Sequence, residues 1–501
     1  MSGGTGSTTA EAPIPAFGEV LGHPRPLWML FMTEFWERFA FYGIRWALVL
    51  YIVAQFHAGS PTGEEPASQL YGAYLALVYA AAIFGGYVAD KILGYQRSIL
   101  LGAVIMACGL FMIAVPDPRI FEFGLATVIV GNGLFKPNIS TMVGKLYSQA
   151  DQRRDSGFTI FYMGINAGAF LAPVLTGWLA DQVFGTTAMP AYKFVFIASG
   201  LGMLVSLVWF WFGRTQLQHI GAPIAGLEGV QTVAYVAVGC LAAIPVMWVL
   251  LAQLGATTLQ YVLTAMFVGL CALLLAEGVR NGPVARDKAI AMLIIFAFNV
   301  MFWMFFEQAG SSFTFLADKI VNRQFGDWTF PVAWFQSVNS IAIIALAPVV
   351  AWVWVKLGAM NPSIPRKFGL GLVFNGLAFL LLMFALSSLV DGAGKIPFWT
   401  LFMVYVIQSV GELCLSPIGL SMVTKLAPVR LVGFGMGGWF LSTGIGNNLS
   451  GIFAGYVSGE SGMTTASALG GYTFGFWALL LSGAILLLLS PVLNRLMHGV
   501  K

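Results

Sequence analysis

The stretch Glu34-Phe-Trp-Glu37-Arg38-Phe places three charged side chains inside the first long apolar segment of the chain. A charge at the centre of a bilayer helix costs about 3 kcal/mol on insertion scales. At about 100° per residue, Glu37 and Arg38 lie on either side of Glu34, and Tyr42 and Arg45 continue the same stripe. Such a stripe must face protein or water, not lipid. It predicts either an ion pair that only joins two helices or the proton-titrating, ligand-binding face of a transporter.

The composition is that of a membrane protein with many spans. Of the 501 residues, 58% are hydrophobic and 9% are charged, whereas an ordinary soluble chain has about 25% charged residues. The four cysteines and four histidines lack the spacing of a disulfide framework or a metal site. We therefore expect an all-α polytopic membrane protein without a metal or another cofactor.

Fourteen apolar stretches are long enough to cross about 30 Å of hydrocarbon. They cover residues 28–56, 69–90, 98–116, 121–146, 156–184, 192–213, 230–252, 257–278, 289–318, 331–357, 367–389, 396–425, 432–458 and 471–496. This pattern predicts a flexible cytoplasmic tail (1–27), an N-terminal six-helix bundle (28–213), an inserted transmembrane helix pair (230–278) and a C-terminal six-helix bundle (287–497). We expect the inserted pair to be a lipid-facing hairpin.

The charges in the connections predict the orientation. With the N-terminus in the cytoplasm, seventeen Lys and Arg residues fall on the cytoplasmic side and five on the opposite side. This bias follows the positive-inside rule and places both termini in the cytoplasm. Charge alone does not distinguish fourteen spans from twelve, because removing the middle pair preserves the alternation. The length and apolarity of the two middle stretches favour fourteen.

Six helices, an inserted pair and six more helices indicate the two pseudo-symmetric bundles of the major facilitator superfamily. The connection Gly85-Gly86-Tyr-Val-Ala-Asp90-Lys91-Ile-Leu-Gly94-Tyr-Gln-Arg97 resembles the loop motif between the second and third helices of that superfamily. Its glycines permit close helix packing, and Asp90 and Arg97 can clamp neighbouring helix ends. We expect these two residues to act in gating and not to contact substrate.

Seven charged side chains lie well inside predicted spans and must pair or face water. They are the acids Glu34, Glu37, Glu307 and Glu412 and the bases Arg38, Arg45 and Lys136. All three bases belong to the first bundle, whereas two acids belong to the second. Ion pairs across the bundle interface can therefore act as gates, and a zwitterionic substrate can replace them by giving its carboxylate to the bases and its ammonium to an acid.

At these residues the chain resembles the proton-dependent oligopeptide transporter (POT) family of the major facilitator superfamily, prokaryotic branch. The stretch from Glu34 to Gly43 matches the ExxER signature of the family, and Phe161-Tyr162-Met-Gly-Ile-Asn166-Ala-Gly168 matches its helix-five signature. Three further stretches fall where family motifs are expected: Gly131-Asn-Gly-Leu-Phe-Lys136-Pro-Asn, Phe306-Glu307-Gln308 and Gly411-Glu412-Leu-Cys-Leu-Ser416-Pro417. Phe41 departs from the family, which often has Tyr there.

The resemblance implies a role for each matching residue. Arg45 and Lys136 would hold the peptide carboxylate, while Asn166, Asn339 and Glu307 would receive the amino terminus. Tyr42 and Tyr79 would hydrogen-bond the peptide backbone, and Trp439 would line a side-chain pocket, with Glu412 and Ser416 completing the substrate site. Interbundle pairs would be Arg45 with Glu307 and Lys136 with Glu412. From the residues alone, packing is the favoured interpretation of Tyr79 and Trp439, whereas Asn166 and Asn339 can equally form hydrogen bonds between helices.

These residues predict a symporter that couples protons to di- and tripeptide import by alternating access. Glu34, Glu37, Arg38 and Glu307 would carry the proton coupling, since protonating Glu307 would release Arg45 for the substrate carboxylate. The expected setting is a monomer among the lipids of a bacterial inner membrane, with no nucleic-acid partner. The alternatives are another solute of the superfamily, such as nitrate or a peptide-like drug, a channel, and a multipass membrane enzyme or receptor.

Overall fold

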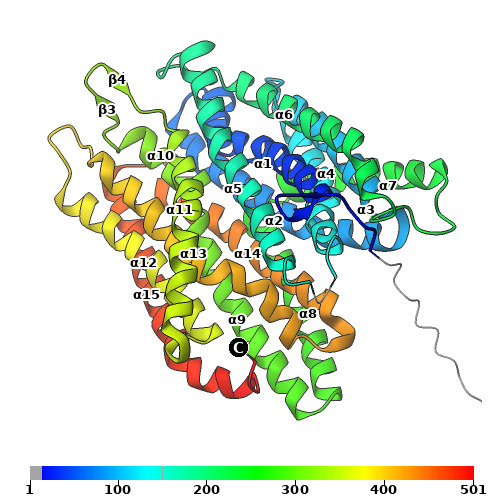
Figure 1. Cartoon of the computed structure of the whole chain (residues 1–501). Helices are drawn as coiled ribbons and strands as arrows, with labels where there is room; N and C mark the ends of the chain where they lie inside the picture. The colour runs from blue at the N-terminus through cyan, green and yellow to red at the C-terminus, as the bar shows by residue number, and fades with distance from the viewer. Residues whose placement is uncertain (1–13, 149–150, 501) are drawn as a thin grey trace, which may run out of the picture.

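The computed structural model describes residues 14–148 and 151–500 and consists almost entirely of helices (Figure 1). Helices suit this sequence because they satisfy every backbone polar group internally, which the hydrocarbon of a membrane demands.

The first bundle holds α1 (Arg25–Tyr51), α2 (Glu64–Val88), α3 (Tyr95–Met112), α4 (Pro118–Lys145), α5 (Arg154–Trp178) and α6 (Tyr192–Gly213). The inserted pair is α7 (Val230–Trp248) and α8 (Ala256–Arg280). The second bundle holds α9 (Pro283–Phe306), the short α10 (Ser312–Lys319), α11 (Trp334–Leu357), α12 (Ile364–Ser388), α13 (Phe398–Leu426), α14 (Val432–Ser458) and α15 (Thr465–Leu496).

Within the described ranges the long helices number fourteen, as the apolar stretches predict, and the all-α fold class is confirmed. By length and composition, twelve segments can cross a membrane. The two long helices outside that set, α4 and α14, carry buried polar side chains such as Asn132 and Asn447 and face neighbouring helices along much of their length. The bundle interior thus tolerates polarity that a lipid-facing helix does not.

The predicted unbroken helix over 289–318 is wrong. Helix α9 ends at Phe306, a tight turn covers Glu307–Gly310, and α10 begins at Ser312. Ser311 is not helical (φ −132°, ψ −97°). The turn is fixed by Gln308, whose Nε2 donates to Ser450 Oγ over 3.0 Å. This break presents the Glu307 carboxylate at the seam between the bundles.

The two bundles lie side by side, the first at the upper right of Figure 1 and the second at the lower left. We call the side where α1 begins and α15 ends the terminal side, and the opposite side the far side. Direct ties between the bundles gather in the far half. There α2 and α14 approach so closely that a Cβ on Gly72 would lie 2.6 Å from Gly451 Cα, and Ser337 Oγ donates to the Phe170 carbonyl over 2.8 Å.

The inserted helices α7 and α8 do not pack on each other as the expected hairpin would. Helix α7 packs on α4 of the first bundle, whereas α8 packs on α14 and α9 of the second. Trp248 Nε1 donates to Glu122 on α4 over 2.9 Å, and Asn448 on α14 donates to the Ala256 carbonyl over 2.9 Å. Each bundle therefore holds one helix of the pair, and the two are joined by the far-side turn at 249–255.

Of the predicted cytoplasmic tail (1–27), residues 1–13 lie outside the described residues. Residues 14–24 include a two-stranded ribbon of β1 (Glu19–Val20) and β2 (His23–Pro24). Glu19 pairs with Arg153 over 2.6 Å, and His23 Nδ1 is 2.8 Å from the Tyr147 hydroxyl. A second ribbon, β3 (Gln324–Phe325) with β4 (Trp328–Thr329), lies on the far side before α11.

Candidate functional site

The charged stripe of α1 folds into a sealed cluster around Arg38. Arg38 Nε lies 3.1 Å from Glu34 Oε1 and also bonds Glu37, and the three side chains are at most 3% exposed. Asn132 on α4 donates to Glu37 Oε1 over 3.1 Å. The Arg38 guanidinium carbon lies 5.0 Å from the centre of the Phe41 ring. Phe41, which lacks the hydroxyl often found in the family, therefore supports the cation through its ring face.

The second charged group is a tie between the bundles. Arg45 Nη2 on α1 donates to Glu307 Oε2 over 2.5 Å, and Arg45 Nε donates to the Tyr71 hydroxyl on α2 over 3.0 Å. The Arg45 and Glu307 side chains are 13% and 11% exposed. The Arg45–Glu307 pair is thus partly exposed, whereas the Arg38 cluster is sealed. The contact expected between these two residues is present.

Tyr42 stands between the two groups. Its ring centre lies 6.0 Å from the guanidinium carbon of Arg38 and 5.7 Å from that of Arg45. The side chain is half-buried. A single aromatic ring thus separates the sealed cluster from the accessible pair.

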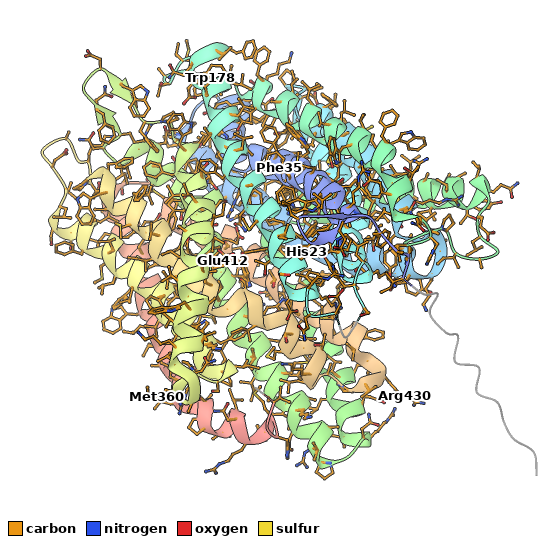
Figure 2. The ribbon with its side chains drawn as sticks, in the orientation of Figure 1. His23, Phe35, Trp178, Met360, Glu412 and Arg430 are labelled. Carbon is orange, nitrogen blue, oxygen red and sulfur yellow. The ribbon has the colours of Figure 1, made fainter. Side chains whose placement is uncertain are left out.

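The expected pair of Lys136 with Glu412 is not formed, and no ion pair joins the two among the residues described. Lys136 Nζ instead lies 4.4 Å from the centre of the Tyr79 ring. Glu412 accepts a hydrogen bond from Asn339 Nδ2 over 3.1 Å, and the same amide donates to Ser409 over 2.9 Å. Each charge is held within its own bundle, and both side chains are partly buried. Figure 2 shows Glu412 at mid-depth, between Trp178 on the far side and Met360 on the terminal side.

The charges of the two bundles form one electrostatic network. Glu412 is within electrostatic reach of both Arg45 and Glu307. Lys136 is within reach of Glu307 and also of the two acids in the Arg38 cluster. A change of protonation at Glu307 therefore alters the field at both Arg45 and Lys136.

The remaining predicted site residues lie in three settings. Asn166 donates to the carbonyl of Tyr162 one turn earlier over 3.0 Å, so its amide stabilises α5 in this conformation. Trp439 is buried against Phe296 and Phe368, with ring centres 6.1 and 6.0 Å away, as a packing residue would be. Ser416 Oγ is buried and makes no hydrogen bond to any described residue.

The loop motif after α2 is arranged differently from the expected clamp. Asp90 accepts a hydrogen bond from Tyr95, within its own connection. Arg97 donates to main-chain carbonyls just before α7, those of Leu227 and Gly229 at 3.4 Å and that of Glu228. Arg97 therefore fixes the lead into the inserted pair. The predicted close helix approach is present at Gly85, where a Cβ would lie 1.8 Å from the Gly133 carbonyl oxygen.

Three residues that sequence reasoning left without a role belong to these groups. Tyr71 lies in an apolar span, where tyrosine carries no distinctive signal, and Asn132 lies inside the stretch from Gly131 to Asn138 next to the more conspicuous Lys136. Glu64 was expected before the span, yet α2 begins there and its carboxylate is fully buried. It pairs with Lys319 at the end of α10 and accepts the Met463 N–H over 2.7 Å, which ties the far ends of the bundles together.

No group of three or more His, Cys, Asp or Glu side chains within the described part of the chain is arranged to hold a metal ion. The charged groups of the site are carboxylates, guanidinium groups and an ammonium.

Comparison with known proteins identifies the family. The model of the POT family matches residues 96–468. A peptide transporter of Yersinia enterocolitica subsp. palearctica is 35% identical over 509 residues, covering 96% of each chain. The dipeptide and tripeptide permease B of Yersinia enterocolitica is 32% identical and covers 96% of this chain and 97% of the permease. A crystal structure of a POT peptide transporter with alafosfalin superposes with a TM-score of 0.82 at 34% identity, covering 96% of this chain and 97% of that one. Sequence, fold and site together show that this chain belongs to the POT family of the major facilitator superfamily.

Proposed function

We propose that this protein is a proton-coupled symporter that imports di- and tripeptides across the cytoplasmic membrane by alternating access. The single observation that carries the proposal is the water-accessible pair of Arg45 with Glu307 at the seam between the bundles. The pair joins a base of the first bundle to an acid of the second, so a ligand or proton that breaks it acts directly on the contact between the bundles.

The charges suit the two ends of a peptide. Arg45 offers a planar fork and Lys136 a point charge for the carboxylate. Glu412, held by Asn339, offers an acid for the ammonium on the opposite bundle. Di- and tripeptides share these two ends whatever their side chains, which supports a substrate class defined by its backbone.

Proton coupling follows from competition for Arg45. When Glu307 takes up a proton it loses its negative charge, and its bond to Arg45 changes from an ion pair to a weaker neutral contact. Arg45 is then available to the substrate carboxylate. The Arg38 cluster supplies further acids, because one guanidinium is shared by Glu34 and Glu37. We therefore propose Glu37 and Glu307 as the principal proton-coupling acids.

The far-side ties support a conformation that is closed on that side. Glu64 with Lys319, Ser337 with the Phe170 carbonyl, and the close approach of Gly72 to Gly451 all lie there. With both termini in the cytoplasm, as the charge bias predicts, the far side is periplasmic in a bacterial inner membrane. One chain supplies both bundles and every residue of the site, so the monomer is the proposed transporting unit.

A competition panel tests the substrate class. Uptake of a labelled dipeptide would be measured against unlabelled di- and tripeptides, nitrate and a peptide-like amine drug, the solutes of the alternative within the superfamily. Inhibition by di- and tripeptides with different side chains, and none by nitrate, supports the proposal. If nitrate inhibits the uptake of the labelled dipeptide and unlabelled peptides do not, the substrate class is an inorganic anion and the peptide assignment is wrong.

A further inference from the structure

A cavity of about 370 Å³ lies on the far side, outside the site described above. It is lined by residues 52–57, which follow α1, by the far ends of α2 and α4, and by the segment between α7 and α8. The walls are largely apolar, and three polar side chains reach the cavity. The apolar residues include Leu70, Phe121 and Leu251, and the polar ones are His57, Gln69 and Glu122.

Glu122 gives the cavity a negative charge that no cation in the described ranges neutralises by a direct ion pair. Its Oε2 accepts a hydrogen bond from Trp248 Nε1 over 2.9 Å, and the Trp248 ring stacks on Phe123 with centres 4.7 Å apart. These contacts fix the carboxylate where α7 joins the first bundle. A carboxylate held in a partly apolar cavity favours a ligand that brings a cation with N–H donors.

Arg119 supplies a positive charge on the same helix as Glu122. Arg119 precedes Glu122 by three residues and therefore lies on the same side of α4. Its side chain is exposed, and no ion pair or side-chain hydrogen bond ties it to another described residue. The His57 ring, which lines the cavity, likewise has no hydrogen bond within the described ranges. The cavity thus offers an acid on one wall, and the exposed guanidinium of Arg119, which does not itself line the cavity, is within electrostatic reach of that acid. An acid with a guanidinium nearby complements an ammonium next to a phosphate.

The position of the cavity points to a ligand from the membrane. Arg119 and Glu122 lie in the first turns of α4, and His57 follows the end of α1, so these groups lie where spanning helices meet the headgroup layer. The adjoining helices α7 and α8 are the least buried of the candidate spans, at 11% and 17%. The surface around the cavity is therefore apolar and faces acyl chains.

We propose that this cavity binds a phospholipid with a primary-amine headgroup. Glu122 would accept from the ammonium, Arg119 would hold the phosphate, and the apolar wall would cover the glycerol region and the first methylenes of the chains. Phosphatidylcholine has the same net charge but no N–H to donate, and phosphatidylglycerol lacks the cation. The site is separate from the peptide site, and this inference does not depend on the transported solute.

Lipid binding by delipidated full-length protein tests the proposal. Native mass spectrometry would count adducts with palmitoyl-oleoyl phosphatidylethanolamine, phosphatidylcholine and phosphatidylglycerol at matched concentrations. We expect phosphatidylethanolamine to bind about three- to fivefold more tightly than the other two lipids. This ratio of affinities corresponds to the contribution of one ion pair that is partly exposed to solvent. Glu122→Gln keeps an acceptor for Trp248 and should bind all three lipids alike. Arg119→Gln, an exposed change, should weaken phosphatidylethanolamine binding without altering the melting temperature.

The matched control is Glu460→Gln, which removes an exposed acid beyond the end of α14 on the same side and should leave the preference unchanged. Soluble phosphoethanolamine separates a lipid site from a site for a free metabolite. If it protects the protein from thermal unfolding as well as the lipid does, the lipid assignment is wrong. Equal binding of the three lipids to the unmodified protein, or an unchanged preference in Glu122→Gln, would also overturn it.

Discussion

Arg45 on α1 and Glu307, in the turn that interrupts the chain between α9 and α10, form a 2.5 Å ion pair across the seam of the two bundles. Each partner owes its position to a local feature. Tyr71 accepts from Arg45 Nε, and the end of α9 at Phe306 allows the Glu307 carboxylate to face the first bundle. Because both side chains stay partly exposed, the pair can exchange its partner for a substrate carboxylate or a proton.

Replacing Arg45 by alanine should strongly weaken dipeptide binding. The change removes the guanidinium fork, and a hydrogen bond to a charged group contributes about 1.5–3 kcal/mol, so affinity should fall by about ten- to a hundredfold or more. Arg45→Lys keeps the charge without the fork and should give an intermediate loss. Isothermal titration calorimetry measures both variants. An unchanged affinity in Arg45→Ala would remove Arg45 from the carboxylate site.

Glu37→Gln should uncouple the protein from protons. The amide keeps the size of the side chain and can still accept from Asn132, but it cannot carry the charge that Arg38 shares between two acids. Accumulation of a dipeptide driven by an acid gradient should be lost, while exchange of internal for external dipeptide continues in part. Uphill accumulation that survives in this variant would exclude Glu37 from coupling.

Tyr71→Phe tests the support of the guanidinium. It removes the hydroxyl that accepts from Arg45 Nε at 3.0 Å and leaves the pair with Glu307 in place. The loss of one hydrogen bond, about 0.5–1.5 kcal/mol, should weaken dipeptide binding by about two- to tenfold. Tyr235→Phe on the exposed face of α7 is the matched control. A loss as complete as that of Arg45→Ala would mean that Tyr71 contacts the peptide itself.

Gly72→Val tests the close packing of α2 on α14 in the far half. A Cβ there would lie 2.6 Å from Gly451 Cα, so the helices must separate. Overpacking of this kind costs about 1–3 kcal/mol and should lower the melting temperature and increase the labelling of a far-side cysteine probe. Gly86→Val on the same helix is the control, since a Cβ there meets nothing within 4 Å. Equal behaviour of the two variants would show that the far-side seam has no special role.

The sequence predicted the helices well and the pairing of charges less well. The bounds of helices such as α6 and α14 follow from local hydropathy and connection chemistry, which are properties of short segments. The interruption at Glu307 has no Pro or Gly signal at its start, so the apolar pattern continues through it. The burial of Glu64 was also missed, because its partner Lys319 is remote in sequence and the apolar run begins only later.

The arrangement of Lys136 and Glu412 shows a second limit. Both charges lie in long helices, as predicted, but which charge pairs with which depends on how the two bundles pack against each other. In this structure each is held within its own bundle, by Tyr79 and by Asn339. The sequence identifies which acids and bases can pair, whereas the structure shows which pairs are formed in one conformation.

Dipeptide uptake into proteoliposomes of the purified protein tests the central claim most directly. Uptake would be followed with an acidic exterior and repeated after a protonophore is added, with Arg45→Ala as the inactive control. The account predicts accumulation above the external concentration that collapses when the protonophore dissipates the gradient. Folded protein that takes up no dipeptide under either condition, or that accumulates it equally with the protonophore present, would contradict proton-coupled peptide transport.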